Sequence, residues 1–403
     1  MNLTEGLKVI DITSNYAGPG AAALLAVYGA EVIHIERPVL GDDSRHFPPK
    51  LDGESLNFVK TNHSKKSVVL DMKDPRAIDI ILKMAEESDI FIESYRPGVM
   101  KGLGLDYETI KRYNDKIIYC SVSGFGQTGP YAQRPGYDVI AQAYSGLMYK
   151  TGEPDGHPTK SGTVIGDSVG TLNAFAAIMS ALYHRERTGE GQYIDISLAR
   201  GLVYMSVNLN FTSTGEVGQR TGNHDRGLCP YGVFEGNDGE AIVIGAVNSA
   251  TWVNLCKAMG KNDLAFHPDF VSNDVRVANK SRVNEIVTEW VKSMSSVADV
   301  EKRLLECGVP CSMIYDDKMV FEDVHARECG WITAVPVSEG ITSVDTFYAV
   351  SGPMELEKCK PEFRQAPVMG QHNVEVLSRF GLTKSEIEQM QAEWKAKALS
   401  KRK

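Results

Sequence analysis

Metal-binding and disulfide patterns are missing from this 403-residue chain. Its nine histidines include no H-E-x-x-H, and its seven cysteines include no C-x-x-C. Cys307 and Cys311 are four positions apart, but no pair of histidines lies near them. Zinc sites need ligands at characteristic spacings. We therefore expect no metal site, and we expect reduced thiols that are mostly buried.

Positive charge and long apolar runs are also scarce. The 43 lysines and arginines are outnumbered by 52 aspartates and glutamates, which gives a net charge of −9, whereas non-specific nucleic-acid binding needs a basic surface. No apolar run reaches the roughly 18 residues of a membrane span. The N-terminal residues M-N-L-T-E-G-L-K do not form a charged-then-apolar signal peptide. We expect a cytoplasmic protein that binds neither nucleic acid nor membranes.

The sequence does show a regular alternation of short strands and helices over residues 1–200. The predicted strands cover residues 7–13, 31–35, 67–70, 89–93, 117–123 and 192–198, and the predicted helices between them include residues 20–28, 75–87 and 107–113. Such alternation is typical of a parallel sheet with helices on both faces. The predicted fold class is α/β, with a Rossmann-like large domain.

The pattern loosens after residue 200, and residues 201–228 are predicted to form a connector. A hairpin with its turn at Asn237–Gly239 follows, and three helices complete a smaller α+β domain over residues 229–330. These helices are predicted at residues 251–259, 282–294 and 297–307. Residues 331–403 are predicted to return to the large domain and complete it.

Two glycine patterns raise a nucleotide-binding alternative. Residues Gly18–Ala23 match the G-x-G-x-x-A of dinucleotide-binding proteins, and Glu36 stands at the end of the next strand. However, Ser14–Ala17 separate the first strand from the first glycine, whereas that fingerprint needs the turn directly after the strand. The second pattern, Gly124–Gly129, does follow a strand, but the prolines after it forbid the required helix. We expect it to be a loop close to a reacting group.

Asp167 stands at the start of a predicted helix. The residues Leu172–Leu182 are almost all apolar or small, a run too short for a membrane span and typical of a buried helix. On position alone, two interpretations of Asp167 stay open. As an N-cap it would accept hydrogen bonds from the N–H groups of the first turn. As a nucleophile it would stay ionised, because the positive helix end favours its charge.

Several other polar side chains lie just past predicted strand ends, where open α/β sheets bind ligands. They are Arg37, Lys73, Ser94 and Tyr95, together with the neighbouring Leu70. On position alone, the favoured interpretation of Arg37 and Lys73 is that each is an exposed, solvated cation. Tyr137 and Asp138 precede another predicted helix, and they are compatible with turn and cap chemistry or with a role in an active site.

Short segments spread over nearly the whole chain carry a family resemblance. They are A-G-P-G-A at 17–21, I-E-R-P at 35–38, L-D-M-K at 70–73, R-P-G at 96–98, G-F-G-Q-T-G-P at 124–130, Y-D-V-I-A-Q-A at 137–143, G-D-S at 166–168, T-G-E-G-Q at 188–192 and P-V-M-G-Q-H-N at 367–373. In this order they resemble the family III CoA-transferases, the group that contains formyl-CoA:oxalate and carnitine CoA-transferases. In that group the aspartate of the G-D-S segment carries the acyl group.

The resemblance implies that the protein moves CoA from an acyl-CoA thioester to a small free carboxylic acid, through a covalent intermediate on Asp167. Exchange between two thioesters is nearly balanced in free energy, so no tightly bound cofactor is implied. Members of the family form interlocked homodimers, and we expect the same here. The positions that match the family's CoA contacts are Arg37, which would bind the 3′-phosphate, and Leu70, Lys73, Ser94, Tyr95 and Leu103. Tyr137 would belong to the catalytic site, and Tyr16, Asp138 and Gly245 would surround the substrate.

The chain departs from the oxalate-specific members, which carry Gln in place of Tyr16 and a run of glycines where this chain has Gly245 followed by A-V-N-S. This disfavours formate/oxalate exchange. Lys101 and Gly102 stand where a CoA-binding arginine of the family would fall. The acceptor stays open, with carnitine-like acids, 2-hydroxy acids and other monocarboxylates as candidates.

Two alternative functions remain. The α-methylacyl-CoA racemases share the fold, but they use a His in G-H-D where this chain has Tyr137 before Asp138. Racemisation needs two proton-transfer groups, and a phenol is a poor base at neutral pH. A non-catalytic CoA- or nucleotide-binding protein is the second alternative.

Overall fold

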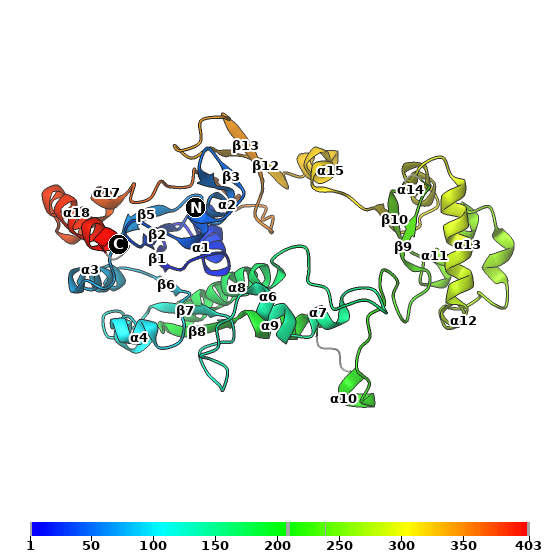
Figure 1. Ribbon diagram of the computed structural model, residues 1–403, viewed down its shortest axis with the longest axis horizontal. Helices are drawn as coiled ribbons and strands as arrows, with labels where there is room; N and C mark the ends of the chain where they lie inside the picture. Colours follow the sequence, from blue (N-terminus) through cyan, green and yellow to red (C-terminus); the bar gives the residue numbers. More distant parts are fainter. Residues whose placement is uncertain (1, 207–209, 238, 401–403) are drawn as a thin grey trace. The chain divides into compact units, whose positions relative to one another are not determined.

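The computed structural model describes residues 2–206, 210–237 and 239–400, and the chain divides into two compact units (Figure 1). Unit 1 comprises Met1–Leu147, Ser161–Val207 and Arg327–Lys403, and unit 2 comprises Met148–Lys160 and Asn208–Ala326. The limits predicted from the sequence differ from these in three places, the first being that the predicted connector 201–228 is divided between the two units after residue 207. Residues 148–160 belong to unit 2, and the return to unit 1 begins a few residues earlier than predicted, at Arg327.

Unit 1 is built on a six-stranded parallel sheet with the order β5-β2-β1-β6-β7-β8. Its strands are β1 (Lys8–Ile12), β2 (Glu31–Glu36), β5 (Lys66–Val69), β6 (Ile90–Glu93), β7 (Ile118–Ser123) and β8 (Gln192–Ser197). Counted within this sheet alone, the order is 3-2-1-4-5-6, which is that of the Rossmann fold. The predicted α/β class is therefore confirmed. The strand order reverses between β1 and β6, and open α/β sheets bind ligands at such a switch point.

Helices cover both faces of this sheet. Successive side chains of a strand point to opposite faces, and apolar residues on both faces have to be buried. Ile90 and Ile92 of β6 join the core beneath one pair of helices, whereas Phe91 joins the core on the opposite face. The first face carries α1 (Ala17–Val27) and α8 (Ile165–Thr188), and the second carries α3 (Pro75–Glu86), α17 (Asn373–Leu377) and α18 (Lys384–Ser400). The C-terminal segment thus contributes directly to the core of unit 1.

Helix α8 is longer than the predicted buried segment 172–182 and is buried along one face only. Its inward face includes Gly170, Ala174 and Ile178, while Leu172 and Tyr183 are 44% and 64% exposed. By length and mean hydropathy this helix alone, among the described residues, resembles a membrane span. Its packing against the sheet is that of a core helix of an α/β layer.

Unit 1 also contains several short elements. They are β3 (Lys50–Leu51), β4 (Glu54–Ser55), α2 (Leu56–Asn62), α4 (Val99–Leu103), α5 (Tyr107–Ile110), α6 (Asp138–Tyr144), α9 (Leu198–Ser206), β12 (Ile332–Pro336) and β13 (Thr346–Val350). Helix α9 corrects the sequence prediction, because the connector was expected to begin at residue 201. Leu198 and Leu202 are buried on the sheet, and this apolar spacing stabilises a helix where the polar residues that follow indicated a loop.

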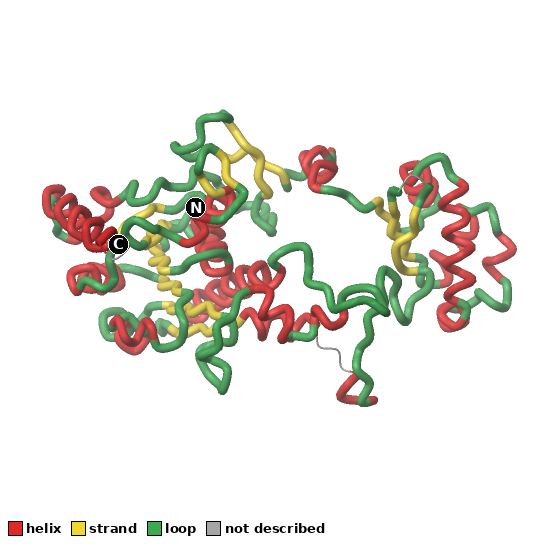
Figure 2. Tube along the Cα trace, viewed as in Figure 1, coloured by secondary structure: helices red, strands yellow, loops and turns green. Residues whose placement is uncertain are grey.

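Unit 2 contains a three-stranded antiparallel sheet with the order β11-β10-β9. Its main elements are β9 (Tyr231–Glu235), β10 (Ala241–Gly245), β11 (Cys311–Met313), α11 (Ser249–Ala258), α13 (Lys280–Ser293) and α14 (Val297–Glu306). The smaller helices are α10 (Asn210–Thr214), α12 (Asn273–Ala278) and α15 (Asp317–Glu322). The predicted hairpin of β9 and β10 is confirmed (Figure 2), although residue 238 of its turn lies outside the described residues. Its helices bury one face of the sheet around Trp252 and Phe234.

Candidate active site

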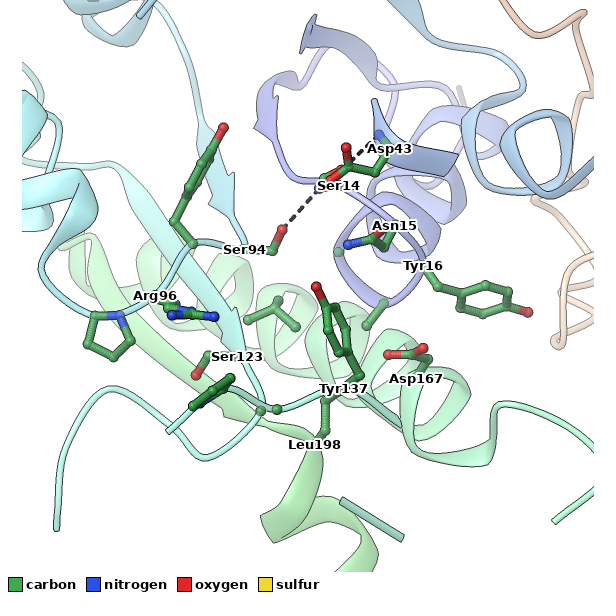
Figure 3. A pocket seen from close by; sticks show the side chains of 18 of the residues that line it. Ser14, Asn15, Tyr16, Asp43, Ser94, Arg96, Ser123, Tyr137, Asp167 and Leu198 are labelled. Carbon is green, nitrogen blue, oxygen red and sulfur yellow. Dashed lines mark hydrogen bonds between the residues drawn. The ribbon is translucent and has the colours of Figure 1, made fainter. Parts of the chain in front are cut away.

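A pocket of about 270 Å³ opens at the switch point of the unit 1 sheet. Its walls come from the loop after β1 with the start of α1 (Ser14–Gly18), the loop after β6 (Ser94–Pro97), the end of β7 and the segment that leads to Tyr137. Asp167 of α8 also lines it (Figure 3). Loops that are distant in the sequence therefore meet at one edge, as expected of the carboxyl ends of parallel strands.

Asp138, rather than Asp167, supplies the cap of helix α8. The helix begins at Ile165, and Val164 at its N-cap position makes no side-chain cap. Instead, Asp138 Oδ1 accepts hydrogen bonds from the N–H groups of Gly166 at 2.6 Å and Asp167 at 3.2 Å. The N-cap interpretation of Asp167 is therefore wrong, and its carboxylate is left to face the pocket.

The expectation that Asp167 stays ionised needs correction. Burial, and then the neighbouring charge of Asp138, raise the pKa of Asp167 to about 7. Both effects disfavour a second negative charge at this helix end, and they outweigh the favourable helix dipole that the sequence suggested. At neutral pH the carboxyl group of Asp167 is therefore divided between its neutral and ionised forms.

For the reaction of Asp167 with acyl-CoA that the sequence led us to expect, the raised pKa of Asp167 predicts a dependence on pH. Only the ionised form is a nucleophile, so kcat/KM should rise about tenfold per pH unit below pH 7 and level off above it. Asp138→Asn keeps an oxygen that can cap the helix but removes a charge, so the inflection should move to lower pH. A profile that is flat from about pH 5 to about pH 8, or an unchanged inflection in the variant, would contradict this assignment.

Two tyrosines border Asp167 in the pocket. Figure 3 shows Tyr137 standing between Asp167 and Arg96, and its side chain is 70% exposed. The Tyr16 side chain lies on the Asp167 side of the pocket and points away from the centre of the pocket. Because Tyr137 is so open, its hydroxyl is available to a bound ligand.

Arg37 and Ser94 also line this pocket, but both have protein partners. The Arg37 guanidinium pairs with the carboxylate of Asp43 and donates to the carbonyl oxygen of Gly41. Ser94 Oγ accepts a hydrogen bond from the N–H of Ser14 at 3.0 Å and so joins the loops after β1 and β6. A phosphate bound by Arg37 would have to compete with Asp43.

Of the remaining predicted contacts, only Tyr95 lies in this pocket. Lys73 and Leu103 line a second pocket between the start of α3 and the end of α4. The Leu70 side chain is buried in the core and lines neither pocket. Gly245 ends β10 in unit 2.

Asn15 and Arg96 were not singled out from the sequence, although both line the pocket. Asn15 adopts a left-handed φ of 76°, which is uncommon for a residue other than glycine and is concentrated at functional sites. Arg96 is exposed, and no hydrogen bond or ion pair joins its guanidinium to another described residue. Only the R-P-G segment containing Arg96 gave a signal for it.

The structure also explains the first glycine pattern without a dinucleotide. Helix α1 begins at Ala17, not at residue 20 as predicted, so the glycines lie in its first turn. A Cβ added to Gly20 would lie 2.7 Å from Thr171 Oγ1 of α8, so this glycine permits close helix packing. Glu36, the expected ribose contact, is buried against Arg45 and Ser67. Its carboxylate is therefore already occupied.

Within the described residues, no three His, Cys, Asp or Glu side chains are placed to hold a metal ion. The pocket lining supplies cations, hydroxyls and one raised-pKa carboxyl group. Such a set is suited to an anionic ligand and to nucleophilic attack by a carboxylate.

Comparison with known proteins identifies the family. The sequence matches CoA-transferase family III over residues 4–373, and the chain therefore belongs to this family of CoA-transferases. It is 35% identical over 381 residues to human succinyl-CoA:glutarate CoA-transferase, covering 93% of this chain and 85% of that protein. It is 40% identical over 315 residues to acetyl-CoA:oxalate CoA-transferase of Acetobacter aceti, covering 77% and 80%. A CAIB/BAIF family protein from Brucella suis has a similar structure, with a TM-score of 0.82, 30% identity and coverage of 94% and 100%.

Proposed function

We propose that Asp167 carries the acyl group covalently while the enzyme moves CoA from an acyl-CoA to a free carboxylic acid. The observation that carries this proposal is the division of roles at the start of α8. Asp138 satisfies the helix N–H groups, and Asp167 presents its carboxyl group to the pocket. A carboxylate without a structural task, at the carboxyl edge of the sheet, is placed to act as a nucleophile.

The reaction that follows is a series of balanced acyl exchanges. The Asp167 carboxylate attacks the thioester carbon, the C–S bond breaks, and CoA thiolate leaves a mixed anhydride behind. The thiolate then attacks the Asp167 carbonyl of the anhydride, which releases the donor acid and forms an aspartyl-CoA thioester. The acceptor carboxylate attacks the carbonyl carbon of this thioester, the C–S bond breaks, and CoA thiolate leaves a second mixed anhydride behind. Attack of CoA thiolate on the acceptor acyl carbon restores Asp167 and releases the new acyl-CoA.

Each of these steps develops negative charge on a carbonyl oxygen. The Tyr137 hydroxyl and the Asn15 amide line the pocket that contains Asp167, so we assign them as hydrogen-bond donors to these oxyanions. Arg37, Ser94, Tyr95 and the unpaired Arg96 would hold the CoA portion. Lys73 and Leu103 are proposed as more distant CoA contacts.

We propose a dicarboxylic acid as the acceptor. The relatives compared above are named for succinyl-CoA with glutarate and for acetyl-CoA with oxalate, and succinate, glutarate and oxalate are dicarboxylic acids. Three arginines line the pocket and give it affinity for anions. The interlocked homodimer and the cytoplasmic location stay predictions from the sequence.

A transfer assay tests this function directly. We expect the purified protein to form a new acyl-CoA from succinyl-CoA only when an acceptor acid is added, with glutarate, oxalate, malate and butyrate as the panel. In deuterated water the α-hydrogen of a 2-methylacyl-CoA should not exchange, because no histidine lines the pocket among the described residues to act as a second base. Deuterium incorporation without acceptor-dependent transfer would establish the racemase alternative instead.

A further inference from the structure

Lys60 of α2 is a cation beside Tyr16, which lines the pocket that contains Asp167, and no ion pair with an acid among the described residues neutralises it. Its side chain is exposed, and the ammonium nitrogen lies 5.3 Å from the centroid of the Tyr16 ring. No hydrogen bond or ion pair connects this ammonium to another described residue. The neighbouring Phe58, Val59 and Thr61 are buried, so the helix fixes Lys60 on its outward side.

Tyr16 connects this cation to Asp167. The backbone carbonyl oxygen of Ala17, the next residue, accepts a hydrogen bond from Thr171 Oγ1 at 3.0 Å. Thr171 lies one helical turn beyond Asp167 in α8. Both Tyr16 and Asp167 line the pocket. Figure 3 shows the Tyr16 ring passing on the Asp167 side, with its hydroxyl directed away from the centre of the pocket.

The three arginines that line the pocket are placed differently. Arg96 lies across Tyr137 from Asp167 (Figure 3), Arg37 is paired with Asp43, and Arg134 lies over the rings of Phe125 and Tyr131. Arg37 and Arg96 are better placed for the CoA portion of the substrate than for an acid that reacts at Asp167 from the Tyr16 side. Lys60, which lies beside Tyr16, is thus the cation available to an acid that binds on this side.

We propose that Lys60 and the Tyr16 hydroxyl form a subsite for the second carboxylate of a dicarboxylic acid. While one carboxylate reacts at Asp167, the other keeps its charge, and a charge-assisted hydrogen bond to an ammonium stabilises it. This inference rests on the proposed function. Because donor and acceptor acyl groups use the same place in the two half-reactions, the subsite also holds the free carboxylate of succinyl-CoA.

Lys60→Met tests the subsite, with acetyl-CoA as a donor that has no second carboxylate. Loss of one charge-assisted contact should raise KM for glutarate about tenfold or more and leave KM for butyrate and kcat with butyrate nearly unchanged. Lys60→Arg should restore most of the preference for glutarate. These readouts separate a binding role from a structural role, which would change both acids alike.

Lys111→Met is the matched control, because the Lys111 ammonium also faces a tyrosine ring, 5.6 Å from the Tyr107 centroid, but Tyr107, unlike Tyr16, lines neither pocket. It should not change the preference between the two acids. An equal effect of Lys60→Met on glutarate and butyrate, or no effect on either, would overturn the subsite. Failure of the unmodified protein to transfer CoA to any acid would instead overturn the proposed function.

Discussion

Asp167→Asn is expected to reduce CoA transfer by about 10⁴-fold or more, because an amide cannot replace a carboxylate nucleophile. The same substitution should stabilise the fold above neutral pH. The raised pKa of Asp167 means that ionising this group disfavours the folded state. That cost is absent below the ordinary carboxyl pKa and grows until the pH passes about 7, and the neutral asparagine avoids it.

Steady-state rates and urea denaturation at acidic and alkaline pH would measure both effects on the same variant. Loss of activity together with a gain in stability at high pH separates a chemical role from damage to the fold. Hydroxylamine trapping after incubation with acyl-CoA should place the adduct on the peptide that contains Asp167. Normal turnover by the variant, or an adduct on another residue, would refute the covalent mechanism. Asp155→Asn, at an exposed position in unit 2, serves as the control substitution.

Lys65→Met is expected to lower the free energy of unfolding by roughly 3–5 kcal/mol, because it leaves a buried charge without its partner. Lys65 Nζ lies 2.8 Å from Asp11 Oδ2 and 2.8 Å from Asn62 Oδ1, and both charged side chains are fully buried. Although burial opposes ionisation, Lys65 and His34 hold the pKa of Asp11 well below its usual range. The substitution would therefore leave an ionised Asp11 paired only with His34.

Lys66→Met is the matched control for this loss. Lys66 is the next residue, but it is partly exposed and pairs with Glu31 and Glu375 at the surface, where such pairs contribute only about 0–1 kcal/mol. Adding Asp11→Asn to Lys65→Met should recover part of the stability, since the unpaired charge is then removed. Urea denaturation of the four proteins measures these differences. Equal losses of unfolding free energy in Lys65→Met and Lys66→Met would show that the buried pair stabilises the fold no more than the surface pairs do.

The sheet and the place of Asp167 at a helix start were predictable from the sequence because their signals are local. Strands such as 31–35 and 117–123 are short apolar runs between turns, and the structure places β2 and β7 there. The G-D-S segment marked Asp167 at a helix start. Local patterns report local structure most reliably when burial and periodicity agree.

The rest depended on contacts between distant segments. Asp138 caps α8 across 28 positions of sequence, and the pKa of Asp167 follows from that proximity and from burial. Residues 148–160 belong to unit 2 through tertiary contacts with residues after 208. Likewise, the Lys60–Tyr16 contact joins α2 to the loop after β1. Sequence position alone contains no measure of these distances.

The switch-point pocket has a consequence for how the enzyme is synthesised. Its lining begins at Ser14 and ends at Leu198, so a nascent chain lacks the complete site until roughly half of the protein has left the ribosome. Strands β1 and β2 can pair early, but the residues that follow them form only one wall of the pocket. Asp167, the proposed nucleophile, arrives with α8, after five of the six sheet strands have been made. Completion of the pocket is therefore a late event in the life of each polypeptide, and an N-terminal fragment that ends before residue 167 lacks the Asp167 carboxyl group.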